Sequence, residues 1–118
     1  MKRIFVYGTL LRGERNHLLL ATSRLAGEAR TAEGFELRDF GEFPAMVRAG
    51  SGAVVGELYL IDPAALRELD RFEEHPDFFA RTRVVLASGE TVEAYLLPPE
   101  RAAGKSTIVG GDWRGQNA

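Results

Sequence analysis

The sequence has 118 residues, of which 45% are hydrophobic and 27% charged, and its formal net charge is −2. This length and composition are typical of one soluble globular domain over residues 1–118, and they exclude a mainly disordered chain. Basic residues are scattered, so the basic stripe of a nucleic-acid-binding protein is missing. No apolar run approaches the ~20 residues of a membrane span. We therefore expect neither a nucleic acid nor a membrane as partner.

Cysteine is absent from the sequence, which excludes disulfides, thiolate nucleophiles and cysteine-bound metals. The two histidines, His17 and His75, lack the spacing of a zinc site, so no metal is expected. Lys2 and Arg3 precede only a short apolar stretch, which predicts a first strand rather than a signal peptide. Because a chain without cysteine is also compatible with a reducing compartment, we expect a cytoplasmic protein.

The N-terminal half of the chain predicts mainly extended structure. Lys2–Val6 contains β-branched and aromatic residues and predicts a strand that enters a loop at Tyr7-Gly8-Thr9. Asn16 is expected to cap a short helix through Leu18–Leu20. Two further extended pieces are expected over residues 27–37 and 43–47.

The C-terminal half predicts a strand, a helix and a hairpin. Val54–Ile61 predicts a strand, in which Gly56 marks either a bulge or a close approach of two backbones. Asp62 is a favoured N-cap and Pro63 a favoured first helical residue, so a helix is expected from here to about Glu73. The hairpin is expected over residues 81–87 and 91–97, and the tail beyond it is expected to be irregular. Together these elements favour an α+β fold, with a mixed, barrel-like β-sheet and a few flanking helices.

One carboxylate of the predicted helix lies on its apolar side. At about 100° per residue, Glu73 falls roughly 40° from the centre of the stripe formed by Ala65, Leu66, Leu69 and Phe72. The other carboxylates, including Asp70, fall about 100° or more away. Burial raises the pKa of a carboxyl group toward neutrality, as general acid/base catalysis near pH 7 requires. Alternatively the helix frays before Pro76, and Glu73 then lies in water.

The loop after the first strand is a second candidate site. Gly8 permits a close approach of ligand to backbone, and successive amides at a strand end can bind an anionic or carbonyl oxygen. An ordinary turn is the alternative. Phosphate binding has little support, because no Gly-Lys-Ser/Thr follows the glycine.

Five segments resemble the gamma-glutamylcyclotransferase-like family. The family's opening YGTL/YGSL signature is matched at residues 6–13, its PA segment at 43–45 and its strand with the pattern V-x-G-E-L/V-Y at 55–59. Its LDxxE segment is matched at 69–73, and a Gly-Asp-Trp tail of bacterial members at 111–113. These matches occur in the family's order and span nearly the whole chain.

The resemblance implies a mixed, barrel-like α+β fold around a small cavity, a small-molecule γ-glutamyl substrate and no cofactor. The glutamate that closes the LDxxE segment is the family's acid/base, which here is Glu73. The backbone amides that bind the glutamyl moiety are those of Tyr7, Gly8, Thr9 and Leu10. The implied reaction cyclises a γ-glutamyl group to 5-oxoproline and releases an amine or amino acid.

Two features of the sequence concern the substrate. The family often has tyrosine six residues after the catalytic glutamate, where this chain has Phe79, so one possible hydrogen bond to the substrate is missing. Arg81 follows and is the arginine we rank first for binding a substrate carboxylate.

Tyr59 and Tyr95, on predicted strands, are expected to pack in the core. The alternative to an enzyme is a member of the same fold that binds a small molecule without turnover.

Overall fold

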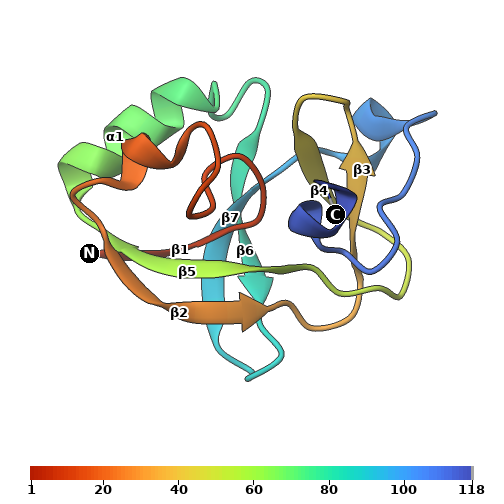
Figure 1. Ribbon diagram of the computed structural model, residues 1–118, viewed down its shortest axis with the longest axis horizontal. Helices are drawn as coiled ribbons and strands as arrows, with labels where there is room; N and C mark the ends of the chain where they lie inside the picture. Colours follow the sequence, from red (N-terminus) through yellow and green to blue (C-terminus); the bar gives the residue numbers. More distant parts are fainter. Residues whose placement is uncertain (118) are drawn as a thin grey trace.

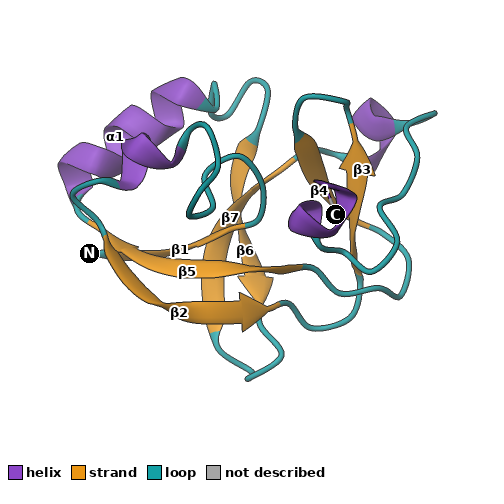
Figure 2. Cartoon of the chain, in the orientation of Figure 1, coloured by secondary structure: helices purple, strands orange, loops and turns teal. Residues whose placement is uncertain are grey.

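The structure is a computed structural model that describes residues 1–117, and the side chains of residues 1–115. The described chain contains one mixed sheet, one α-helix and three short 3₁₀ helices (Figures 1 and 2). The strands are β1 (Lys2–Val6), β2 (Arg24–Arg30), β3 (Phe35–Asp39), β4 (Pro44–Arg48), β5 (Val55–Ile61), β6 (Ala80–Val85) and β7 (Thr91–Leu96). The helices are α1 (Pro63–Phe72), η1 (His17–Leu20), η2 (Pro99–Ala102) and η3 (Trp113–Asn117).

The strand order is β2-β5-β1-β7-β4-β3, and β6 pairs with β7 off this path. β1 is antiparallel to β5 and parallel to β7, so the sheet is mixed. The α+β prediction is confirmed, and the sheet is not closed into a barrel. Figure 1 shows α1 and η1 side by side over one end of β1 and β5. Fully buried side chains such as Ile4, Phe5, Met46, Ile61 and Leu69 form the core between these layers.

Strand β7 has three partners on its two edges. β6 pairs with it along its whole length and occupies one edge. The other edge is shared, because β1 pairs with it at Glu93 and β4 pairs with it at Leu96. The hydroxyl of Tyr7 lies where β1 and β4 diverge. It donates to the carbonyl of Tyr95 (2.6 Å) and accepts from the amide of Met46 (3.2 Å).

Most of the predicted elements are present at the expected positions. Strand β1 has the predicted bounds, and α1 begins at Pro63 with the Asp62 carboxylate accepting from the Ala65 amide (2.9 Å). Asn16 precedes η1, but its side chain does not cap this helix and donates instead to the hydroxyl of Thr9 (3.0 Å). The single strand expected over residues 27–37 is wrong, since β2 and β3 are separate strands. The exposed face of β2 carries no apolar alternation by which its bounds could be predicted.

Gly56 is explained by a close approach of two backbones. A Cβ atom at this position would lie 2.1 Å from the carbonyl oxygen of Val6, at the end of β1. The register irregularity that marks a bulge lies instead in β2, between Leu25 and Gly27. Only glycine therefore lets β5 pass the end of β1, where the loop that follows begins.

We predict that Gly56→Ala lowers the free energy of unfolding by about 2 kcal/mol or more, because the new methyl group meets backbone rather than a movable side chain. Denaturant titration measures this loss. Gly115→Ala is the control, because its nearest atom would lie 3.9 Å away, in ordinary contact. Equal stability of the two variants would contradict the close approach.

Candidate active site

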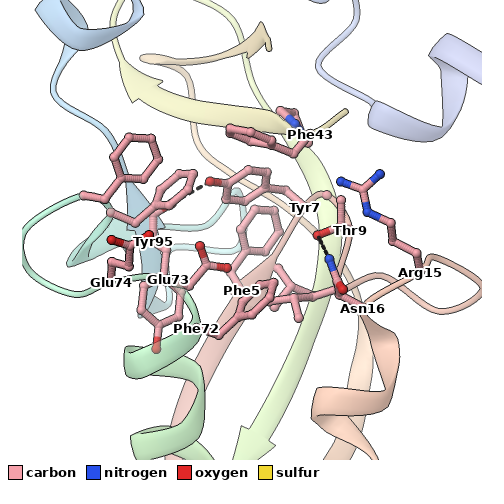
Figure 3. Close-up of a pocket in the computed structure, with 16 residues that line it drawn as sticks. Phe5, Tyr7, Thr9, Arg15, Asn16, Phe43, Phe72, Glu73, Glu74 and Tyr95 are labelled. Carbon is pink, nitrogen blue, oxygen red and sulfur yellow. Dashed lines mark hydrogen bonds between the residues drawn. The ribbon is translucent and has the colours of Figure 1, made fainter. Parts of the chain in front are cut away.

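A cavity of about 200 Å³ lies beyond the end of β1 (Figure 3). Four segments line it: residues 5–10 with Arg15 and Asn16, the Phe43-Pro44 pair, residues 72–74 with Phe78 and Phe79, and Tyr95 of β7. The strand end, the end of α1 and the fork of the sheet thus meet around one small hollow. Its volume suits a metabolite the size of an amino acid derivative.

Glu73 lies at the C-cap of α1, with its side chain in the lining of this cavity. Its amide donates to the carbonyl of Leu69 (2.8 Å), so the last helical turn is intact and does not fray. Figure 3 shows the carboxylate directed toward Tyr7. Burial raises the pKa of Glu73 to about 7, and no cation or donor in the described part of the chain offsets it. A group with this pKa can both accept and donate a proton near neutral pH.

The loop from Tyr7 to Leu10 lines the other side of the cavity. The carbonyls of Gly8 and Thr9 accept from the amides of Leu11 (3.1 Å) and Asn16 (3.0 Å). The amides of Gly8, Thr9 and Leu10 donate no hydrogen bond to any group within residues 1–117. Since buried amides almost always have a partner, consecutive free amides beside a cavity are typical of a site for a ligand oxygen.

Two further contacts define the shape and polarity of the loop. A Cβ atom at Gly8 would lie 2.7 Å from the ring of Pro44, so only glycine fits here. Burial raises the pKa of Tyr7, and the nearby charge of Glu73 raises it further. The Tyr7 phenol therefore stays protonated and keeps its bond to the Tyr95 carbonyl.

Comparison with known proteins places the chain in a family. Residues 4–115 match the model of the family described as gamma-glutamyl cyclotransferase, AIG2-like. The chain belongs to this family. A Vibrio cholerae protein, provisionally named a gamma-glutamylcyclotransferase, is 38% identical over 93% of each chain. The gamma-glutamylaminecyclotransferase of Bos taurus is 43% identical over 71% of this chain and 55% of its own length. The crystal structure of an AIG2-like protein from Mus musculus is similar, with a TM-score of 0.74 and 30% identity over 95% of this chain and 88% of that one.

In this member of the AIG2-like family, Arg81 is not part of the cavity lining. Its guanidinium binds the carboxylates of Asp70 (3.1 Å) and Glu93 (2.9 Å), and its amide donates to the ring of His75 (2.9 Å). The expectation that Arg81 binds a substrate carboxylate therefore has no support from its position. Both carboxylate partners of Arg81 lie on other elements, α1 and β7, so their contacts with it could not be predicted from the sequence.

Asp70 also differs from the helical-wheel expectation. Its carboxylate accepts from the hydroxyl of Tyr95 (2.6 Å) as well as from Arg81, so strands β6 and β7 reach the flank of α1. Tyr95 accordingly has two roles, since its ring lines the cavity and its hydroxyl holds the helix. Glu73 itself lies in the cavity lining, and burial raises its pKa to about 7.

Sequence reasoning missed the aromatic part of the cavity lining. The ring centroid of Phe79 lies 6.3 Å from that of Phe43 and 5.2 Å from that of Phe78. Phe72, which is 44% exposed, also lines the cavity. The position where the family often has tyrosine, Phe79, is thus part of an apolar wall. The Phe-Phe pair after Pro76 was the available signal, because adjacent aromatic residues in a loop require a surface to pack against.

The described residues contain neither a metal-binding cluster nor a helix that could cross a membrane. Within residues 1–117, no group of three or more histidine, aspartate or glutamate side chains is arranged to bind a metal ion. Among the helices of the same residues, none is both long and apolar enough to cross a membrane.

We predict that Glu73→Gln stabilises the folded protein above pH 7. The folded pKa of about 7 exceeds the ordinary 4.5, so the folded state holds this proton more tightly and loses stability as the pH rises between these values. The ionised Glu73 carboxylate then lowers the free energy of unfolding by about 3 kcal/mol, and an uncharged glutamine avoids this loss. Urea unfolding at pH 4 and pH 8 measures the difference, which should vanish at pH 4.

The control for this prediction is Glu68→Gln. Glu68 lies on the same helix, and its side chain is 61% exposed and pairs with Arg71 at the surface. Its replacement should change stability by about 0.5 kcal/mol or less at either pH. A destabilised Glu73→Gln protein at pH 8 would show that the Glu73 carboxylate is not dehydrated.

Proposed function

We propose that this chain is a cyclotransferase that converts a γ-glutamyl group to 5-oxoproline and releases an amine or amino acid. The observation that carries this proposal is the Glu73 carboxyl group, with a pKa of about 7, across a small cavity from amides that have no partner in the described chain. Membership of the gamma-glutamyl cyclotransferase, AIG2-like family supports the same reaction class.

The loop of Tyr7, Gly8, Thr9 and Leu10 binds the glutamyl moiety. Its free amides donate to oxygen atoms of the substrate, and the absence of a Cβ at Gly8 lets the loop pack against the ring of Pro44. The substrate is thereby held with its α-amine folded back on its own γ-carbonyl. Such positioning makes the intramolecular attack far more probable than in free solution.

Glu73 transfers the protons. The substrate α-ammonium must lose one proton before its nitrogen can attack, and the Glu73 carboxylate accepts it. The nitrogen then forms a bond to the γ-carbonyl carbon, and the bond from this carbon to the leaving nitrogen breaks. The leaving nitrogen takes a proton from the Glu73 carboxylic acid. The ring nitrogen then loses its second proton to the Glu73 carboxylate, which passes it to the released amine, so that the amine leaves as its ammonium ion and Glu73 is ionised again. The reaction consumes neither water nor a cofactor, so we propose a cofactor-independent enzyme.

The leaving group occupies the side of the cavity formed by Phe43, Phe78 and Phe79. This wall offers apolar contacts and few hydrogen bonds, which accommodates different amines without a strict polar requirement. The Bos taurus relative carries the name gamma-glutamylaminecyclotransferase, which supports an amine as leaving group. The soluble, small-molecule substrate and the absence of cysteine agree with a cytoplasmic location.

We predict that Glu73→Gln reduces 5-oxoproline release by about 10²-fold or more, because the amide can neither accept nor donate the proton. A panel of γ-glutamyl amines and γ-glutamyl amino acids, followed by mass spectrometry of the product, measures this loss. Glu68→Gln is again the control and should turn over like the wild type. Binding of 5-oxoproline without turnover of any compound would favour the non-catalytic alternative.

The pH dependence of the wild type gives a separate prediction. kcat/KM should fall about tenfold per pH unit below pH 7, because protonation of Glu73 removes the base. The acid limb of kcat should lie at lower pH, since a bound substrate ammonium favours the ionised carboxylate. An acid limb near pH 4 in kcat/KM would contradict a dehydrated Glu73 in the free enzyme.

A further inference from the structure

A second carboxylate, Glu57 of β5, is buried next to the substrate loop. Its side chain is 0% exposed and lies outside the cavity lining. Oxygen Oε1 accepts from the amide of Arg12 (3.0 Å) and from the hydroxyl of Tyr59 (3.0 Å), and Oε2 accepts from Nε of Arg12 (2.9 Å). The tyrosine that we assigned to the core thus also has a polar contact.

Glu57 is ionised in this setting, in contrast to Glu73. Burial alone would raise the pKa of Glu57, but the hydrogen bonds from Arg12 and Tyr59 outweigh it and lower this pKa. Burial and the same carboxylate together raise the pKa of Tyr59 to about 12, so its hydroxyl remains a donor. A buried charge with donors in fixed places restricts the segments that carry these donors.

The segment restricted by Glu57 is the substrate loop. Arg12 lies two residues after Leu10, and both its amide and its guanidinium bind the carboxylate. The start of the loop is held by the Tyr7 hydroxyl, and the Leu10 carbonyl lies 2.9 Å from Nδ1 of His17. Glu57 is therefore the contact that ties the far end of the loop to the sheet.

The C-terminal tail is tied to the same place. Arg114 donates to the carbonyl of Arg12, and its guanidinium lies 3.5 Å from Oε2 of Glu57. The indole of Trp113 donates to Glu14 (3.1 Å) in the turn that follows the loop. The segment that follows the loop, residues 12–14, thus contacts both the buried carboxylate and the tail.

We propose that Glu57 is a positioning residue, which holds the amides of Gly8, Thr9 and Leu10 in their substrate-binding arrangement through Arg12. Its effect on turnover rests on the function proposed above. Because Glu57 lies outside the cavity, it acts without touching the substrate or Glu73. Its loss should therefore weaken binding of the glutamyl group and leave the proton transfer intact.

We predict that Glu57→Gln lowers kcat/KM about tenfold or more, mainly through KM, since one oxygen becomes an NH₂ group that faces Nε of Arg12. The acid limb of the pH profile should stay where it is in the wild type. Glu28→Gln is the matched control, because exposed Glu28 pairs with Glu57 in register on β2. Wild-type kinetics of Glu57→Gln, or a displaced acid limb, would overturn the positioning role.

Arg12→Met tests the same contact from the partner of Glu57, whose side chain is 55% exposed. It removes the guanidinium but keeps the amide bond, so KM should rise less than in Glu57→Gln. An unchanged KM would overturn the role of the guanidinium.

Hydrogen exchange separates the positioning role from the proposed reaction. The amide of Arg12 should exchange faster in Glu57→Gln than in the wild type, while the amides of α1 should not. Calorimetric binding of 5-oxoproline should weaken in parallel. If the wild type turns over no γ-glutamyl compound, the proposed function fails, whereas unchanged exchange and binding in Glu57→Gln would overturn the positioning role by itself.

Discussion

The edge of β7 opposite β6 is shared between β1 and β4, and the position of the cavity depends on this arrangement. Where the two strands diverge, no continuous ladder can satisfy the backbone groups of β7. The hydroxyl of Tyr7 satisfies two groups there, the carbonyl of Tyr95 and the amide of Met46. A side chain thus replaces ladder hydrogen bonds at the fork, and the space between the diverging strands becomes the hollow into which α1 directs Glu73 (Figure 3).

Two dehydrated carboxylates lie near the substrate loop, and their surroundings shift their pKa values in opposite directions. Glu73 has no donor to offset its burial, so its proton affinity is near that needed for exchange with a substrate at neutral pH. Glu57 accepts hydrogen bonds from Arg12, Tyr59 and Arg114, and hydrogen bonds lower its pKa and keep it ionised. Burial without a donor makes Glu73 reactive as an acid and a base, whereas the donors around Glu57 hold their own segments in fixed positions. The same residue type therefore serves chemistry or geometry according to its neighbours.

The sequence predicted those features that depend on local pattern. Helical periodicity identified Glu73, and the N-cap Asp62 with Pro63 located the start of α1. The features that depend on distant segments could not be predicted in this way. The position of Glu57 in the strand pattern is that of an ordinary exposed residue, and its partner Arg12 lies 45 positions away. Arg81 was expected in the site because charge alone cannot show that Asp70 and Glu93 already bind it.

The open sheet leaves strand β2 at an edge, where unpaired backbone groups could pair with another chain. The irregularity between Leu25 and Gly27 bends this strand, and Arg24, Glu28 and Arg30 place exposed charges along it. A flat neighbouring strand cannot match a bent one over many residues, and it would have to dehydrate these charges. The irregular register and the exposed charges of β2 thus disfavour edge-to-edge pairing of this strand with another chain.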